Sequence, residues 1–182
     1  MSHRNPPTGR VEAVCTVHSV RASGTRRVAH TAIDKRPVTG PVQVRRLGLA
    51  GDRQCDTAHH GGRHKAVYAY AEDEARRWAD ELGRELPAGW FGENLRVSGI
   101  AASDAVIGER WRIGALGLLL EVTGPRTPCG TFGVWAQEPG WVRRFAARGA
   151  TGADMKVLAE GPVAAGDGIV VGHVPQNRGT LR

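Results

Sequence analysis

Residues 116–130 read LGLLLEVTGPRTPCG, and they contain the richest apolar run of the chain followed by a proline-flanked cysteine. The apolar part, Leu116 to Val122, is too short to span a bilayer and predicts a buried strand that ends near Thr123. Two prolines then stiffen the backbone, and Gly130 allows another group to approach closely. We therefore expect a buried strand that leads into a rigid turn bearing Cys129.

Other short segments repeat this strand-and-turn pattern. Residues 11–17 alternate apolar and polar positions, which places Cys15 on the apolar face of a half-buried strand. Further strands are expected at 42–47, 65–70, 94–97, 110–113, 157–159 and 169–171, with a loop or short hairpin at 21–40 and a turn-rich segment at 48–63. With 25 glycines between such short strands, the pattern predicts a mainly β fold with short helices and a closed or strongly bent sheet.

Two segments have helical periodicity instead. Residues 72–82 place Ala75, Trp78 and Leu82 on one face, and Gly83 follows as a helix stop. A second, shorter helix is expected around residues 141–146. Trp90, Phe91, Trp135 and Trp141 are by default core residues.

Composition narrows the classes of function. The 182 residues fit one domain, with a core at about 11–173 and flexible tails. The net charge of +7 comes almost entirely from arginine and favours an anionic ligand, but no basic stripe interleaved with aromatic residues points to nucleic acid. Three cysteines in no disulfide-like spacing and the lack of an apolar leader predict a cytoplasmic protein without a membrane segment. The sequence contains neither a dinucleotide fingerprint nor a P-loop.

The segment GDRQCDTAHHGGRHKAVYAY, residues 51–70, is the first candidate site. Its Gly61-Gly62 pair can bring backbone amides close to an anion, while Asp52 and Asp56 can orient the histidines or fix the loop. The alternative is a polar turn without a ligand.

Two further segments carry candidate residues. Glu93-Asn94 lies at the start of a strand, where the pair either caps a turn or contributes to a ligand pocket. Cys129 has the setting of a reactive thiolate, since Arg126 can lower the pKa of the thiol. Cys15 is expected in the core, and the neighbours of Cys55 do not single it out.

Together these segments resemble the MOSC domain, the family named for the C-terminal domain of molybdenum cofactor sulfurases, and in particular its stand-alone bacterial, YiiM-like members. The matching pieces are residues 51–70, FGENLRVSG at 91–99, IGERWRIGALGLLLEVTGPRTPCG at 107–130 and VLAEGPVAAGDGIVV at 157–171. The segment 151–156 departs from the family, in which many members carry an aromatic residue before this strand.

The resemblance implies a closed β-barrel and a molybdenum cofactor (molybdopterin) with Cys129 as the protein ligand of the metal. It also implies reduction of N-hydroxylated compounds, namely hydroxylaminopurines, amidoximes or hydroxamic acids, with electrons from a separate reductase. Residues expected to hold the cofactor or shape its pocket are Arg126, His60, Gly61, Gly62, Lys65, Glu93 and Asn94. His60 is also a candidate catalytic proton relay, because histidine changes charge near neutral pH.

A carrier and a zinc hydrolase remain open as alternatives, and nucleic-acid binding by the histidine-rich loop has the least support. Cys129 could hold the cofactor or a persulfide sulfur for delivery to a partner, which makes the protein a carrier. Cys55, His59, His60 and His64 could bind zinc as in a hydrolase, although Gly61-Gly62 interrupts the helix that this spacing needs. Pyridoxal phosphate on Lys65 is disfavoured, because in the fused sulfurases that cofactor belongs to a different domain.

Overall fold

The computed structural model describes residues 8–175, in which short strands predominate and helices are few. The strands are β1 (Thr8–Ala22), β2 (His30–Pro37), β3 (Val42–Arg45), β4 (Gly48–Leu49), β5 (Val67–Ala71), β6 (Leu95–Ser98), β7 (Arg110–Ile113), β8 (Leu118–Pro125), β9 (Ala153–Ala159), β10 (Gly161–Val163) and β11 (Gly168–His173). The helices are α1 (Glu72–Leu82), α2 (Gly130–Ala136) and α3 (Trp141–Arg148), with short 3-10 turns at Arg63–Lys65 and Ala102–Asp104.

Seven of the described strands close into a barrel. Their order is β11-β7-β8-β9-β5-β6-β1, and β1 pairs back with β11 through Thr8 opposite Val170 and Arg10 opposite Gly168. A small sheet of β10, β3 and β4 adds Val44 and Val163 to the same apolar core. The expected closed, mainly β architecture is confirmed.

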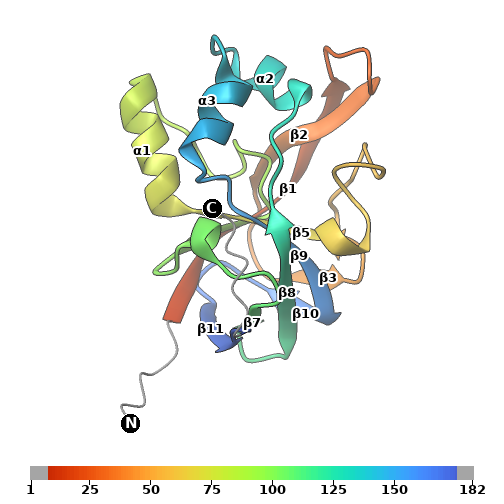
Figure 1. Ribbon diagram of the computed structural model, residues 1–182. Helices are drawn as coiled ribbons and strands as arrows, with labels where there is room; N and C mark the ends of the chain where they lie inside the picture. Colours follow the sequence, from red (N-terminus) through yellow and green to blue (C-terminus); the bar gives the residue numbers. More distant parts are fainter. Residues whose placement is uncertain (1–7, 176–182) are drawn as a thin grey trace.

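Strand β1 is longer than its periodicity predicts, and its two halves pair with different strands. Its first half closes the barrel, while its second half pairs with β2 as a hairpin that projects from the barrel beside α2 (Figure 1). Because a bulge lies between Val11 and Ala13, the core position passes to Val14, and the strict alternation predicted for 11–17 is wrong. Cys15 is fully buried, as expected.

The predicted limits of several elements also change. Residues 8–10 belong to β1 rather than to a tail, and β9 begins four residues before the expected strand at 157–159. The remaining parts of the predicted flexible tails, residues 1–7 and 176–182, lie outside the described residues. Helix α2 was missed, because Gly130 and Gly133 weaken the helical signal of so short a segment.

The helices gather at one end of the barrel around an aromatic cluster (Figure 1). Ring centroids of Trp78 in α1 and Trp141 in α3 are 4.6 Å apart, and Tyr70 of β5 stacks on Phe91 at 4.2 Å. The predicted helices at 72–82 and 141–146 are confirmed, and Gly83 ends α1 in the left-handed conformation with φ 62°. Of the four aromatic residues expected in the core, Phe91 and Trp141 are buried, whereas Trp90 and Trp135 are half-buried against this cluster.

The structure places Glu93 in the interior, away from any ligand pocket. Its fully buried carboxylate accepts hydrogen bonds from the amides of Gly89 (2.7 Å) and Phe91 (3.0 Å), and it pairs with Arg96 at 2.6 Å. These donors occupy both oxygens, so the cofactor-binding role suggested for Glu93 is replaced by the turn-fixing alternative.

Among the described residues, no helix is long and apolar enough to cross a membrane.

Replacing Glu93 by Gln should lower the free energy of unfolding by about 3 kcal/mol, because it leaves the buried Arg96 guanidinium without its full countercharge. Urea unfolding of both proteins measures the change. Arg76→Ala is the matched control, since it removes an exposed ion pair with Glu72 and should cost about 0.5 kcal/mol or less. Equal losses in the two variants would contradict the assignment of Glu93 as the fixed centre of this turn.

Candidate functional site

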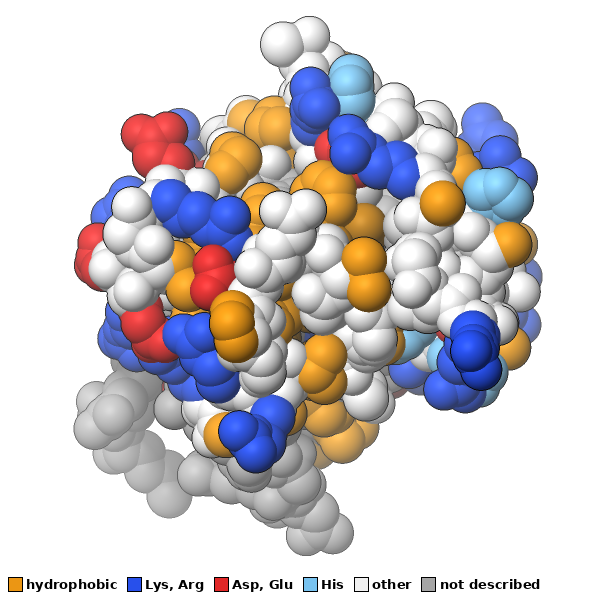
Figure 2. Space-filling model, turned by 90° about the horizontal axis from the view of Figure 1, so that it is seen from above, with side chains coloured by type: hydrophobic (Ala, Val, Ile, Leu, Met, Phe, Trp, Pro, Cys, Tyr) orange, Lys and Arg blue, Asp and Glu red, His pale blue; other side chains and the backbone are white. Residues whose placement is uncertain are grey.

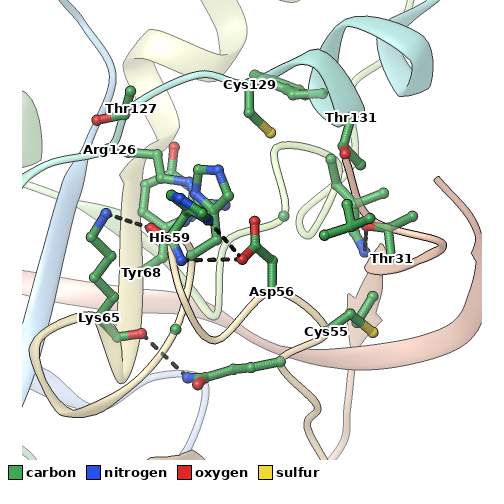
Figure 3. Close-up of a pocket in the computed structure, with 18 of the residues that line it drawn as sticks. Thr31, Cys55, Asp56, His59, Lys65, Tyr68, Arg126, Thr127, Cys129 and Thr131 are labelled. Carbon is green, nitrogen blue, oxygen red and sulfur yellow. Dashed lines mark hydrogen bonds and ion pairs between the residues drawn. The ribbon is translucent and has the colours of Figure 1, made fainter. Parts of the chain in front are cut away.

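A cavity of about 720 Å³ opens beside the helix end of the barrel. Its walls are the β1–β2 hairpin, the loop at 50–65 and the turn between β8 and α2, which are far apart in the sequence (Figure 3). A cavity of this size suits a small-molecule ligand or cofactor. Seen from the helix end, Lys and Arg side chains are spread among hydrophobic ones and do not form one continuous basic face (Figure 2).

Cys129 is the thiol that faces this cavity. Strand β8 ends at Pro125, and the chain then runs extended to Cys129, whose carbonyl oxygen accepts the first-turn hydrogen bond from Gly133 at 3.1 Å. The half-buried sulfur points into the cavity, whereas the sulfur of Cys55 points away from its middle (Figure 3). Burial raises the pKa of Cys15 to about 12, so that thiol is unreactive.

Two of the predicted basic residues lie together on one wall. The Lys65 ammonium donates a hydrogen bond to the carbonyl oxygen of His59 at 2.7 Å, and the Arg126 guanidinium lies over the ring of Tyr68 with its carbon 5.1 Å from the centroid. Both approach the buried carboxyl group of Asp154, at 4.0 Å and 3.8 Å respectively. The cations therefore meet on one wall, as expected for a site that holds an anion.

His60 lines the cavity but is poorly suited to change charge near neutral pH. Burial disfavours its imidazolium form and Arg126 repels it, so the pKa of His60 falls from 6.5 to about 4. This shift of the pKa does not favour the expected proton relay, which needs a charge change near pH 7. The neighbouring His59 is held by Asp56 at 3.1 Å and by Arg27 at 2.5 Å, which ties the loop to the hairpin tip.

The glycine pair contributes less to ligand binding than its sequence suggests. The amide of Gly62 donates to the side-chain oxygen of Gln54 at 2.8 Å, so it is not free to bind an anion. Gly61 does line the cavity, where an added Cβ would lie 2.5 Å from that same oxygen. Glycine at this position thus serves the close packing of the loop.

A buried network at the base of the cavity was only partly anticipated. Asp52 pairs with Lys35 at 2.5 Å and accepts hydrogen bonds from the amide of Val17 (2.9 Å) and the side chain of Asn94 (2.7 Å). Asp52 therefore fixes the loop and does not orient a histidine. Asn94 lines the cavity as predicted, but its amide group is engaged with protein partners.

Sequence reasoning missed Lys35 and Asp154 as cavity residues. Lys35 lies in a segment that was expected to be a loop or short hairpin, and Asp154 lies in a strand whose partners, β5 and β8, come from other parts of the sequence. The signal for Asp154 was a charged residue in the segment that departs from the family pattern. The zinc alternative loses its geometric basis, since no group of three or more His, Cys, Asp or Glu side chains in residues 8–175 is placed to hold a metal ion.

The fold and site define a β-barrel protein with a cysteine-bearing cavity at one end. The MOSC domain profile matches residues 56–170, and the chain therefore belongs to the MOSC domain family. It is 35% identical over 136 residues to the uncharacterized protein YflK of Bacillus subtilis, and 35% identical over 102 residues to protein YiiM of Escherichia coli. These matches cover 75% and 54% of this chain, and 61% and 45% of the relatives.

A third relative, named "Reductase", comes from Gibberella moniliformis and is 32% identical over 142 residues, which are 76% of this chain and 25% of that protein. The chain thus spans less than two thirds of each of these relatives. Among solved structures, YiiM from Geobacillus stearothermophilus superposes with a TM-score of 0.76 at 26% identity, covering 95% of this chain and 80% of that one. YiiM from Escherichia coli shares the fold with a TM-score of 0.70 at 23% identity, covering 98% and 74%.

We expect the His60 imidazole to stay neutral down to about pH 5 and to titrate with a midpoint near pH 4. Nitrogen-15 NMR of the ring measures this midpoint, and His60→Gln identifies the resonance. The unfolded chain binds the proton near pH 6.5, so it binds more protons than the folded chain between 6.5 and 4, and stability falls as the pH falls through that window. A midpoint above 6 would restore the proton-relay hypothesis.

Proposed function

We propose that this chain binds the molybdenum cofactor through Cys129 and reduces N-hydroxylated compounds. The observation that carries the proposal is the Cys129 thiol, directed into a cavity of about 720 Å³ with two basic residues on its wall. Membership of the MOSC family and the name of the Gibberella relative agree with reductive chemistry.

The residues of the cavity fit such a cofactor in three respects. A thiolate is a soft ligand that suits molybdenum bound to sulfur. Lys65 and Arg126 supply the positive charge that a phosphate group needs, and the Arg126 guanidinium is already oriented by the ring of Tyr68. The carboxyl oxygens of Asp154 and the Nδ1 atom of His60 are buried and without hydrogen-bond partners among residues 8–175, as expected where a bound molecule completes the site.

Each residue then has a distinct task. Cys129 would ligate the metal from the start of α2, while Lys65 and Arg126 would hold the phosphate of the pterin. The neutral His60 ring would offer one hydrogen-bond donor and one acceptor to a bound molecule without adding charge. The proline-flanked turn keeps the thiol at a fixed position, so the geometry of the metal ligand does not depend on a flexible loop.

The reaction that this site would support is a two-electron reduction. An N-hydroxyl compound, two electrons and two protons give the amine or amidine and one water. When bound, the cofactor supplies the two-electron chemistry, and a separate reductase would deliver the electrons to it. Substrates of this class are amidoximes, hydroxylaminopurines and hydroxamic acids.

Cys129→Ser should abolish near-stoichiometric molybdenum content in protein purified from cells that make the cofactor, because the hard hydroxyl replaces the soft thiolate. Elemental mass spectrometry measures molybdenum per chain, and reduction of an amidoxime by the wild type with an artificial electron donor measures turnover. Cys55→Ser, which alters another cavity thiol, should keep the metal.

Molybdenum retained by Cys129→Ser would contradict the assignment of the metal ligand. Wild-type protein that holds the cofactor tightly without turnover would instead favour the carrier alternative, in which the same thiol delivers the cofactor or a sulfur atom to a partner.

A further inference from the structure

The buried carboxyl group of Asp154 lies on the wall of the cavity. Strand β9 places it in the sheet between Tyr68 of β5 and Gly124 of β8, and its side chain is only 2% exposed. Neither of its oxygens has a hydrogen-bond partner within residues 8–175, although the residue lines the cavity. Buried polar groups in native proteins are nearly always paired, so this exception requires an explanation.

The two neighbouring cations, Lys65 and Arg126, do not explain why the carboxyl group lacks hydrogen bonds. The Lys65 nitrogen is 4.0 Å from one carboxyl oxygen and the Arg126 nitrogen 3.8 Å from the other, which is beyond hydrogen-bonding distance. Each cation is held in place by another contact, Lys65 by a backbone carbonyl and Arg126 by the Tyr68 ring. Burial raises the pKa of Asp154 although both cations oppose the shift, so the protein alone does not compensate the carboxylate.

We propose that Asp154 is a ligand-binding residue that accepts a hydrogen bond from a neutral amidine-type group, in which a planar carbon joins two nitrogens and at least one carries hydrogen. A carboxylate only accepts hydrogen bonds, so a ligand must bring the donor. Lys65 and Arg126 disfavour a cationic group in contact with the carboxyl oxygens, and the carboxylate disfavours an anionic group there, so the pterin phosphate proposed above would contact the two cations and not Asp154. A neutral N–H donor satisfies the oxygens without either penalty.

Both the substrate class and the cofactor of the proposed function carry this group. The inference therefore rests on the proposed function for the identity of the ligand. An amidoxime has a C–NH2 group beside the N-hydroxyl nitrogen, and a pterin ring has adjacent N–H donors on its aminopyrimidinone edge. A hydroxamic acid carries a carbonyl oxygen where the amidoxime has C–NH2. With the N-hydroxyl group held in the same orientation, that oxygen would face the carboxylate as a second acceptor, because the N–H of a hydroxamic acid lies on the N-hydroxyl nitrogen. Asp154 would therefore select amidoximes over hydroxamic acids.

Isothermal titration calorimetry of the cofactor-free full chain tests this selection with three neutral probes: benzamidoxime, benzhydroxamic acid and unsubstituted pterin. In Asp154→Asn, the probe recognised by this residue should bind about 10-fold more weakly, the loss expected for a hydrogen bond to a charged acceptor. Benzhydroxamic acid should change by no more than about twofold by the same arithmetic. Glu121→Gln is the matched control, because this carboxylate is on β8, outside the cavity, and paired with Arg110 and Lys156.

The outcomes separate the sources of the ligand. Weakened benzamidoxime binding alone identifies a substrate-binding residue, and weakened pterin binding alone identifies a cofactor-binding residue. Unchanged binding of both probes in Asp154→Asn, or no binding of either to the wild type, overturns the proposal. Since the probes bind without molybdenum or turnover, this result is independent of the Cys129 test of the proposed function.

A second measurement needs no variant. Carbon-13 NMR of the Asp154 carboxyl group in the wild type should show its pKa falling when the recognised probe binds, because a donor adds to the stabilisation of the ionised form by Lys65 and Arg126 and offsets the burial beside Tyr68 that disfavours it. A carboxyl resonance and pKa that do not respond to a saturating probe would refute the contact directly.

Discussion

The buried carboxylate of Asp52 holds together the parts that make the cavity. It joins the loop at 50–65 to β1 through the Val17 amide, to β2 through Lys35 and to the start of β6 through Asn94. Asn94 in turn accepts a hydrogen bond from the Tyr68 amide of β5. One residue thereby links the loop, β1, β2 and the start of β6 at the base of the cavity, and a buried ion pair of this kind is costly unless every partner is in place.

The barrel supports the site, and the helices cover one end of the barrel and position the thiol. The closed ring leaves no unpaired edge among its seven strands, which makes it a rigid support. The helices cover one end of it through an aromatic cluster, and the half-buried Cys129 packs against that cluster. The thiol is therefore presented by a short connection anchored at both ends, by β8 on one side and α2 on the other.

The charged and polar side chains of the cavity differ in whether they have hydrogen-bond partners. Lys65 and Arg126 are engaged by a carbonyl oxygen and an aromatic ring, whereas the Asp154 carboxyl group and Nδ1 of His60 have no hydrogen-bond partner within residues 8–175. Unpaired buried groups cost folding stability. Asp154 and His60 line the same cavity as the Cys129 thiol, which is the pattern expected when a site is completed by a ligand and when stability is given up for binding.

The sequence by itself determined the mainly β architecture and the two amphipathic helices, and it singled out Cys129 as the candidate thiol, because hydrophobic periodicity, glycine stops and a proline-flanked cysteine are local signals. It misplaced Glu93, credited the Gly62 amide with a free donor and gave His60 an ordinary titration. Only the tertiary structure decided these points and brought Lys35 and Asp154 to the cavity, since hydrogen-bond partners, burial and pKa depend on residues that are distant along the chain.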